Sequence, residues 1–203
     1  MSAEEVMTPV LEDAPYYAAQ GGMTLSGGEP VLQAAFCQEL LQAAQAHDIH
    51  TVIETAGNVP AAQLLRLAPW VDLLLFDLKA WSDGIYHTYI HGNRAQILDT
   101  LAAWSDTGKP VIVRTPVVGG LNDRAEEIEA ISRHIAPLPN LLYYQLIPYH
   151  ALGRAKYDAL DMAYPYDFTT PTPEAMRALE DTALAWVHVY NQQDGVQQRR
   201  TAL

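Results

Sequence analysis

The sequence predicts an α/β fold around a curved parallel sheet of about five strands, which forms a partial (β/α) barrel or an open sheet. Short β-rich runs alternate along the chain with amphipathic helical patterns. Two of these runs, Leu73–Phe76 and Val111–Val113, are continuously apolar, which is typical of parallel strands covered on both faces. The strands are too few to close an eight-stranded barrel.

Each expected element has a pattern of its own. Ser2 and Glu5 have the spacing of a capping box at the start of the first helix. Pro9, further along, argues against a straight helix because it removes a backbone donor. The β-rich runs are Gly22–Ser26, Ile49–Thr55, Val71–Lys79, Pro110–Val118 and Leu141–His150. The helical patterns cover residues 2–17, 30–43, 61–67, 94–107, 124–136 and 172–190. We expect residues 1–190 to form one domain and residues 191–203 to form a frayed polar tail.

The composition excludes several classes of protein. The 203 residues are 49% hydrophobic and 18% charged, which opposes intrinsic disorder. Lys and Arg number 12 against 24 Asp and Glu, and the net charge of -12 repels nucleic acids and anionic membranes. No apolar run approaches the length of a membrane helix, and the acidic start lacks the basic region of a signal peptide. We therefore expect a cytoplasmic protein whose partners are neither nucleic acids nor membranes.

Polar and glycine residues follow the expected strands at their carboxyl ends, which is where parallel α/β folds bind ligands. Because these ends share one rim of the sheet, the pattern predicts a polar ligand site there. The residues concerned, in strand order, are Ser26-Gly27-Gly28-Glu29, Glu54-Thr55, Asp77-Leu78-Lys79, Arg114 within the fourth run, and His150.

The same residues also have structural explanations. The glycine pair can simply turn the chain into the following helix. Glu54 can cap the next segment. Asp77 and Lys79 lie two apart, hence on one face of a strand, and can form an internal ion pair. His150 can be an ordinary histidine at the edge of the core. Their convergence on one rim favours the ligand site.

Two further features resemble reactive sites. His87 and His91 are four apart on a short helical segment, a spacing that can hold a metal, but no glutamate follows His87 and Gly92 ends the segment. Cys37 is the single cysteine and lies in an amphipathic helix, where inert packing is the simpler explanation because no basic neighbour lowers its pKa. A single thiol can form neither an internal disulfide nor a four-cysteine metal site.

Five segments in this order resemble the motifs of glycyl-radical-enzyme activating enzymes, which are radical S-adenosylmethionine (SAM) proteins such as the activating enzyme of pyruvate formate-lyase. Singly each motif is weak, but together and in order they are specific, and they cover about residues 2 to 180. The segments are GGMTLSGGEPVLQ at residues 21–33, ETAG at 54–57, DLK at 77–79, VRTPVVGGLND at 113–123, and LIPYHALGRAKY at 146–157.

The resemblance implies a fold, a reaction and partners. The fold would be the partial barrel of the radical SAM type. The reaction would be the reductive cleavage of SAM at a [4Fe–4S] cluster, followed by abstraction of a hydrogen from a glycine of a partner enzyme. The partners would be a formate-lyase-like glycyl radical enzyme and an electron donor such as flavodoxin or ferredoxin, and the setting would be anaerobic metabolism.

The resemblance also assigns SAM-binding roles. The turn from Ser26 would bind the methionine amino group, and a lysine would meet the carboxylate as a point charge. No side chain need act as an acid or a base, so no catalytic residue is assigned. The SAM-binding residues are expected to be Gly28, Glu29, Glu54, Thr55, Asp77, Leu78, Lys79, Arg114 and His150.

One departure from the family concerns the cluster. The family holds its [4Fe–4S] cluster with a C-x3-C-x2-C motif upstream of the segment that begins here at Ser2, and Cys37 cannot replace that motif. We therefore expect no metal ligands in this chain and no radical chemistry from it alone, whether it is a fragment or receives the missing piece from another chain.

Two alternatives remain open. The chain can be a non-catalytic remnant that binds SAM or docks on a glycyl radical enzyme. It can also be an unrelated α/β lyase or hydrolase that uses Asp77, Lys79 and His150 as acid and base groups, although this needs a metal or nucleophile that the sequence does not offer. The aromatic stretch from Tyr157 to Phe168 is either a strap over the sheet or part of a docking surface.

Overall fold

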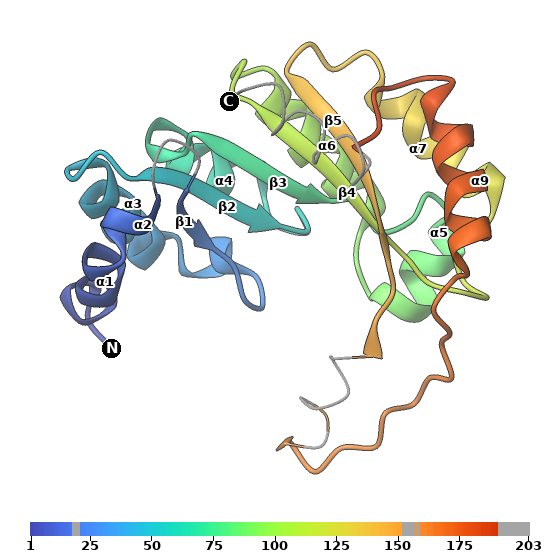
Figure 1. Cartoon of the computed structure of the whole chain (residues 1–203), viewed down its shortest axis with the longest axis horizontal. Helices are drawn as coiled ribbons and strands as arrows, with labels where there is room; N and C mark the ends of the chain where they lie inside the picture. Colours follow the sequence, from blue (N-terminus) through green and yellow to red (C-terminus); the bar gives the residue numbers. More distant parts are fainter. Residues whose placement is uncertain (18–20, 152–156, 158, 191–203) are drawn as a thin grey trace. The chain divides into compact units, whose positions relative to one another are not determined.

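The computed structural model describes residues 1–17, 21–151, 157 and 159–190. Its strands form a five-stranded sheet in the order β1-β2-β3-β4-β5 (Figure 1). The pairs β1–β2 and β2–β3 run parallel, which confirms the predicted α/β fold with a parallel sheet. The strands are β1 (Gly22–Leu25), β2 (His50–Thr55), β3 (Leu73–Asp77), β4 (Val111–Val117) and β5 (Leu141–Pro148).

The chain divides into two compact units, and both β4 and β5 begin in the first and continue in the second. The predicted single domain of residues 1–190 stays a prediction, and the predicted tail of residues 191–203 lies outside the described residues. The first unit comprises Met1–Leu78, His91–Val113 and Leu138–Leu142, and the second comprises Lys79–Ile90, Arg114–Pro137 and the chain from Tyr143 onward.

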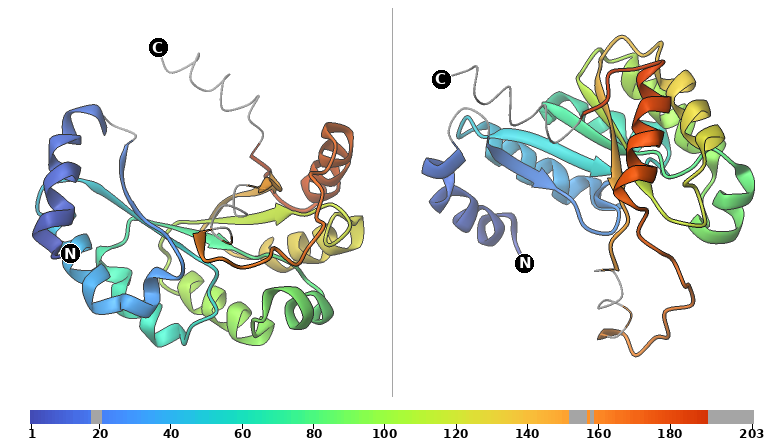
Figure 2. Two further views of the ribbon diagram at one scale, coloured as in Figure 1. Left: turned by 90° about the horizontal axis from the view of Figure 1, so that it is seen from below. Right: turned by 45° about the vertical axis from the view of Figure 1, so that its right-hand side comes forward.

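In the first unit, helices cover one face of strands β1 to β3 (blue to green in Figure 2). Its core contains Leu41, Ile53, Leu64 and Leu74, which are fully buried. Burying each such side chain stabilises the fold by about 1.5–3 kcal/mol. The helices are α1 (Ala3–Glu12), α2 (Ala14–Tyr17), the 3₁₀ turn η1 (Pro30–Gln33), α3 (Ala34–Gln45), α4 (Ala61–Leu67), the 3₁₀ turn η2 (Ala68–Trp70) and α6 (Arg94–Ser105).

The first helix has the predicted capping box. The Glu5 amide donates to the Ser2 hydroxyl at 3.2 Å, and the Ser2 amide donates to the Glu5 carboxylate at 2.6 Å. These two bonds satisfy donors that the helix start leaves unpaired. Pro9 lies inside α1 without ending it.

The second unit contains α5 (Asp83–Ile85), the π-helix η3 (Tyr86–Ile90), α7 (Ala125–Ile135) and α9 (Pro173–Leu184), together with the later parts of β4 and β5. Helices α7 and α9 pack against each other. The sequence pattern predicts a last helix that extends to Tyr190, but α9 ends at Leu184. The edge of β5 explains the difference, because Tyr144 donates to the carbonyl of His188 and accepts from the amide of Tyr190, each at 2.8 Å.

The aromatic stretch of the second unit packs on itself. Tyr166 stacks on Phe168 with ring centroids 4.8 Å apart, and both rings also contact Tyr89 of η3. Just beyond this stretch, the backbone joins the loop that follows β4, where the Gly119 amide donates to the carbonyl of Thr169 at 2.9 Å. These contacts favour the strap interpretation of this segment.

No helix of the described residues is both long and apolar enough to cross a bilayer.

Candidate functional site

The turn after β1 presents bare backbone beside an anchored carboxylate. Ser26, Gly27 and Gly28 are exposed, and Gly27 has a φ of +127°, a conformation that favours glycine. A Cβ on Gly28 would meet no protein atom within 4 Å. The open side of Gly28 therefore leaves its backbone groups accessible to a ligand.

Glu29 ties this turn to the end of β2. Its carboxylate accepts from the Thr55 hydroxyl at 2.8 Å, from the Ala56 amide at 3.1 Å and from the Val31 amide at 3.3 Å. The bond to Val31 also caps η1. The Glu29 carboxylate therefore links the turn after β1 to the loop after β2 at the carboxyl edge of the sheet. Glu29 acts here as a positioning residue.

Thr55 and Gly57 complete this arrangement. Thr55 is buried, and its hydroxyl, which donates to Glu29, also accepts from the Gly57 amide at 3.0 Å. Gly57 has a φ of +69°, and a Cβ there would clash with the Phe76 ring. Only glycine satisfies both the conformation and the contact.

The other predicted residues of the first unit lie at the same edge. Glu54 is half-buried within β2, where it pairs in register with Leu75. Asp77 is half-buried and ends β3. Leu78 follows it, and its side chain is fully buried. Within this unit, the structure therefore joins Glu29 to Thr55 by hydrogen bonds and places Glu54 and Asp77 at the carboxyl ends of β2 and β3.

Lys79 lies in the second unit, beyond the end of β3. Its carbonyl accepts from the Asn122 side-chain amide at 2.7 Å. Asn122 also donates to the Pro116 carbonyl at 2.9 Å and accepts from the Val118 amide at 2.7 Å. The segment that carries Lys79 is therefore fastened to the loop that follows β4.

Arg114 lies in the middle of β4 and is half-buried. Burial and the charge of Tyr190 raise the pKa of Tyr143, and the Arg114 guanidinium opposes them. The positive charge of Arg114 therefore lies close enough to Tyr143 to interact with its phenol. His150 follows the carboxyl end of β5 and is exposed. The matching motif continues through residues 152–156, which lie outside the described residues.

Cys37 packs in the core of the first unit. It is 4% exposed, and its thiol donates to the Pro30 carbonyl at 3.1 Å. Burial raises the pKa of the thiol above its ordinary value, and the negative charge of Glu29 raises it further. The protonated form is therefore favoured, which is typical of a packing residue rather than a nucleophile.

Metal ligands do not gather in the part of the chain that the structure describes: there, no group of three or more His, Cys, Asp or Glu residues could hold a metal ion. His87 lies in η3 of the second unit and His91 in the first, and both side chains are exposed.

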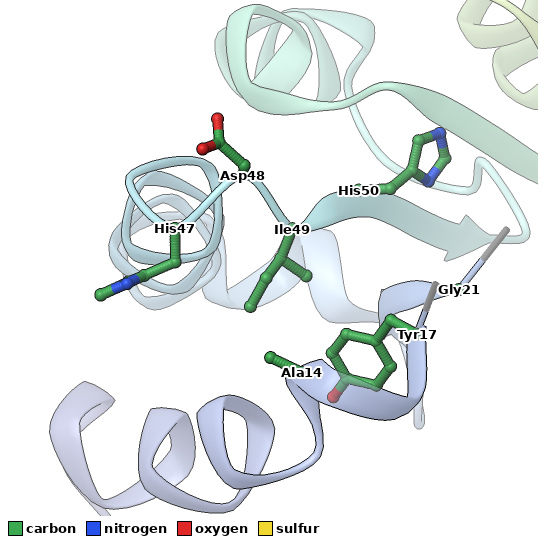
Figure 3. A pocket seen from close by; sticks show the side chains of 7 residues that line it. All are labelled: Ala14, Tyr17, Gly21, His47, Asp48, Ile49 and His50. Carbon is green, nitrogen blue, oxygen red and sulfur yellow. The ribbon is translucent and has the colours of Figure 1, made fainter. Parts of the chain in front are cut away.

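A cavity of about 320 Å³ lies at the opposite edge of the first unit, beside the amino end of β2. In Figure 3, Ala14 and Tyr17 of α2 face Ile49 across it. None of the predicted ligand residues lines this cavity, so it is separate from the carboxyl-edge site. Its lining residues are Ala14, Tyr17, Gly21, His47, Asp48, Ile49 and His50.

Two residues that follow β4 in the chain, Asn122 in the loop and Glu127 in α7, have no role assigned from the sequence. Asn122 is 2% exposed and Glu127 is 6% exposed, and both bond the segment after β3. The Asn-Asp pair at 122–123 was visible in the sequence as part of a motif, whereas nothing in the pattern around Glu127 distinguishes it from the acidic residues of an ordinary first helical turn.

Comparisons with known proteins agree on one superfamily. The family model described as "Radical SAM superfamily" matches residues 1–134. An isethionate sulfite-lyase activating enzyme of Desulfovibrio desulfuricans is 37% identical over 183 residues, covering 89% of this chain and 58% of the relative. A pyruvate formate-lyase-activating enzyme of Streptococcus mutans is 31% identical over 183 residues, covering 87% of this chain and 70% of the relative.

A solved structure supports the fold. The crystal structure of a domain of a pyruvate-formate lyase-activating enzyme from Bacteroides vulgatus superposes with a TM-score of 0.68 at 21% identity, covering 83% of this chain and 97% of that chain. The isethionate sulfite-lyase activating enzymes are longer proteins, and this chain spans 58% to 60% of their length.

Proposed function

Because the chain belongs to the radical SAM superfamily, and within it to the glycyl-radical-enzyme activating enzymes, we propose that it binds SAM and serves in the activation of a glycyl radical enzyme. The observation that carries this proposal is the anchored turn after β1. There an exposed Gly28 adjoins Glu29, whose carboxylate is held by Thr55 and Ala56.

In the first unit, the proposed contacts are with the methionine part of SAM. The backbone at Gly28 accepts the amino group, because no side chain blocks it. Glu29 and Thr55 keep this backbone in place through their mutual hydrogen bonds. Glu54, Asp77 and the main chain of Leu78 supply the remaining polar groups at the same carboxyl edge.

In the second unit, the proposed contacts come from basic and imidazole groups. Lys79 pairs with the SAM carboxylate, to which a compact ammonium is well suited. Arg114 supplies a further positive charge, and His150 reaches the ribose or the methionine end. These roles rest on the motif matches at each position.

In this family, SAM would supply the hydrogen-abstracting group when one electron from a donor cleaves it into methionine and a deoxyadenosyl radical, and the partner's glycine would be the site of abstraction. The residues of this chain bind SAM, orient it and exclude water, and none of them needs to transfer a proton. The residues present do not fit a [4Fe–4S] cluster, since the single cysteine is buried and no metal-binding group occurs among the described residues.

The lone buried Cys37 favours a second candidate function, in which the chain binds SAM or docks on the glycyl radical enzyme without chemistry of its own. Under either function, the partner is a formate-lyase-like glycyl radical enzyme, and the location is the cytoplasm. Under the catalytic one, flavodoxin or ferredoxin donates the electron.

Titration calorimetry with SAM tests the proposed site. We expect saturable binding by the wild-type chain and at least a tenfold loss of affinity, roughly the contribution of one charged contact, in Lys79→Ala. Lys109→Ala is the matched control, because its Nζ donates only to the Val71 carbonyl among the bonds described and it is not a proposed ligand. If both variants bind SAM like the wild type, the assignment of Lys79 is wrong.

A further inference from the structure

We infer that Asn122 and Glu127 are positioning residues, which hold the backbone of residues 79–82 and thereby aim Lys79 at the SAM carboxylate. This inference rests on the proposed function for its ligand. For the backbone itself it rests on hydrogen bonds between described residues of the second unit.

Asn122 uses both kinds of hydrogen-bonding group that a side-chain amide offers. Its Nδ2 donates to the carbonyls of Lys79 and Pro116, at 2.7 and 2.9 Å, and its Oδ1 accepts from the Val118 amide at 2.7 Å. The side chain is 2% exposed, so water does not compete for these bonds. One buried amide therefore fixes the main chain of Lys79 relative to the loop that follows β4.

Glu127 holds the other end of the same segment. Its carboxylate accepts from the amide of Trp81 at 2.7 Å, from the amide of Ser82 at 3.1 Å, and from the Ser82 hydroxyl. Glu127 lies in the first turn of α7, where the helix dipole stabilises a negative charge. A buried carboxylate with three donors is a strong anchor.

The two anchors bracket a short stretch of chain. Lys79 is fixed at its carbonyl, and Trp81 and Ser82 are fixed at their amides. The intervening Ala80 is fully buried. With its backbone held on both sides, the half-buried Lys79 loses little further backbone freedom when its ammonium group meets an anion.

The test compares two Asn→Asp substitutions that remove the same donor. Asn122→Asp deletes the bonds to Lys79 and Pro116. Asn140→Asp is the matched control, because Asn140 donates to the Lys109 carbonyl and accepts from the Ser105 hydroxyl at 2.7 Å, in the first unit. We expect each to lower the melting temperature by about 3–8 °C. Glu127→Gln serves as the milder variant if Asn122→Asp does not fold.

Two readouts separate positioning from simple stability. Hydrogen–deuterium exchange of the amides at residues 80–82 should accelerate about tenfold or more in Asn122→Asp and Glu127→Gln but not in Asn140→Asp. The affinity for SAM should fall about tenfold in the first two variants and less than about twofold in the control. Equal effects of Asn122→Asp and Asn140→Asp on affinity, or unchanged exchange at residues 80–82, would overturn the inference.

Failure of the proposed function has a different signature. If the wild-type chain does not bind SAM, Lys79 is not a SAM ligand, and the proposed role of Asn122 and Glu127 in SAM binding is wrong as well. The exchange measurement still decides whether Asn122 and Glu127 hold residues 79–82.

Discussion

The carboxylate of Glu29 and the hydroxyl of Thr55 are joined at 2.8 Å, which links the turn after β1 to the end of β2. The two residues are 26 positions apart in the sequence. Both belong to motifs that we assigned to SAM binding, yet in the structure each is the other's hydrogen-bonding partner. We therefore propose that their contribution to SAM binding is to hold the backbone at Gly28 in place.

A double-mutant cycle measures this link. Glu29→Ala and Thr55→Val should each destabilise the fold, and their effects should be coupled by about 1–2 kcal/mol in urea unfolding, because a charge-assisted hydrogen bond is removed by either one. Thr100→Val is the control partner, since its buried hydroxyl donates to the carbonyls of Val59 and Gln96. Additive effects for Glu29 and Thr55 would show that the bond contributes nothing.

The buried thiol of Cys37 predicts a dependence of stability on pH. Its pKa in the folded state is raised above the ordinary 9.0 by burial and then by Glu29. A raised pKa contributes stability that is fully present below the unfolded pKa and is lost as the pH rises through the folded one. The difference in melting temperature between the wild type and Cys37→Ala should therefore shrink from about pH 8 to about pH 10.

The same residue offers a kinetic check. A disulfide reagent at about pH 8 should label the urea-unfolded chain much faster than the native chain, because the thiolate is the reactive form and burial withholds it. Equal rates of labelling would mean that Cys37 is accessible, and a difference in melting temperature that grows with pH would mean that its pKa is lowered.

Removing a ring from the aromatic stretch between Tyr157 and Phe168 should lower the stability of the fold. Tyr166 contacts Tyr89, Tyr164 and Phe168, so Tyr166→Ala should cost about 1–2 kcal/mol of unfolding free energy. Tyr16→Ala is the control, because Tyr16 is 84% exposed. An unchanged stability in Tyr166→Ala, combined with weaker capture of a glycyl radical enzyme, would instead support the docking interpretation of this segment.

Because the chain has a single cysteine, we expect that it does not assemble an iron–sulfur cluster by itself. Incubated with iron and sulfide without oxygen, the 203-residue chain should not gain the broad visible absorbance of a [4Fe–4S] cluster, because it holds one thiol, which is buried. Cys37→Ala should retain the same amount of iron as the wild type. A stoichiometric cluster, together with 5′-deoxyadenosine released from SAM by a strong reductant, would contradict this and assign the full activity to the chain.

Much of the fold could be predicted from local pattern. All five strands lie within two residues of the predicted bounds, because apolar runs and turn residues mark them, and α4 has the predicted bounds of Ala61–Leu67. The end of α9 could not be predicted, because the Tyr190 amide bonds the carbonyl of Tyr144 in β5, 46 positions away in the sequence. Here tertiary pairing overrides helical spacing.

The candidate site likewise has residues that could be predicted from the sequence and residues that could not. Placement at the carboxyl ends of strands followed from the parallel α/β pattern, which identified Gly28, Glu54 and Asp77 as edge residues. The anchors formed by Asn122 and Glu127 did not follow from it. They bond main-chain groups 43 to 46 positions away, and a sequence shows no periodicity for such contacts.

The central claim is that the turn at Gly28 receives SAM, and titration calorimetry of Gly28→Val tests it most directly. A Cβ at Gly28 meets no protein atom within 4 Å, so the valine variant should keep the wild-type melting temperature. Gly84→Val is the matched control, because Gly84 has the same open surroundings and lies in α5. We predict saturable binding of SAM by the wild type and by Gly84→Val, and a loss of at least about tenfold in Gly28→Val. Equal binding by all three proteins, or no binding by the wild type, would contradict the claim.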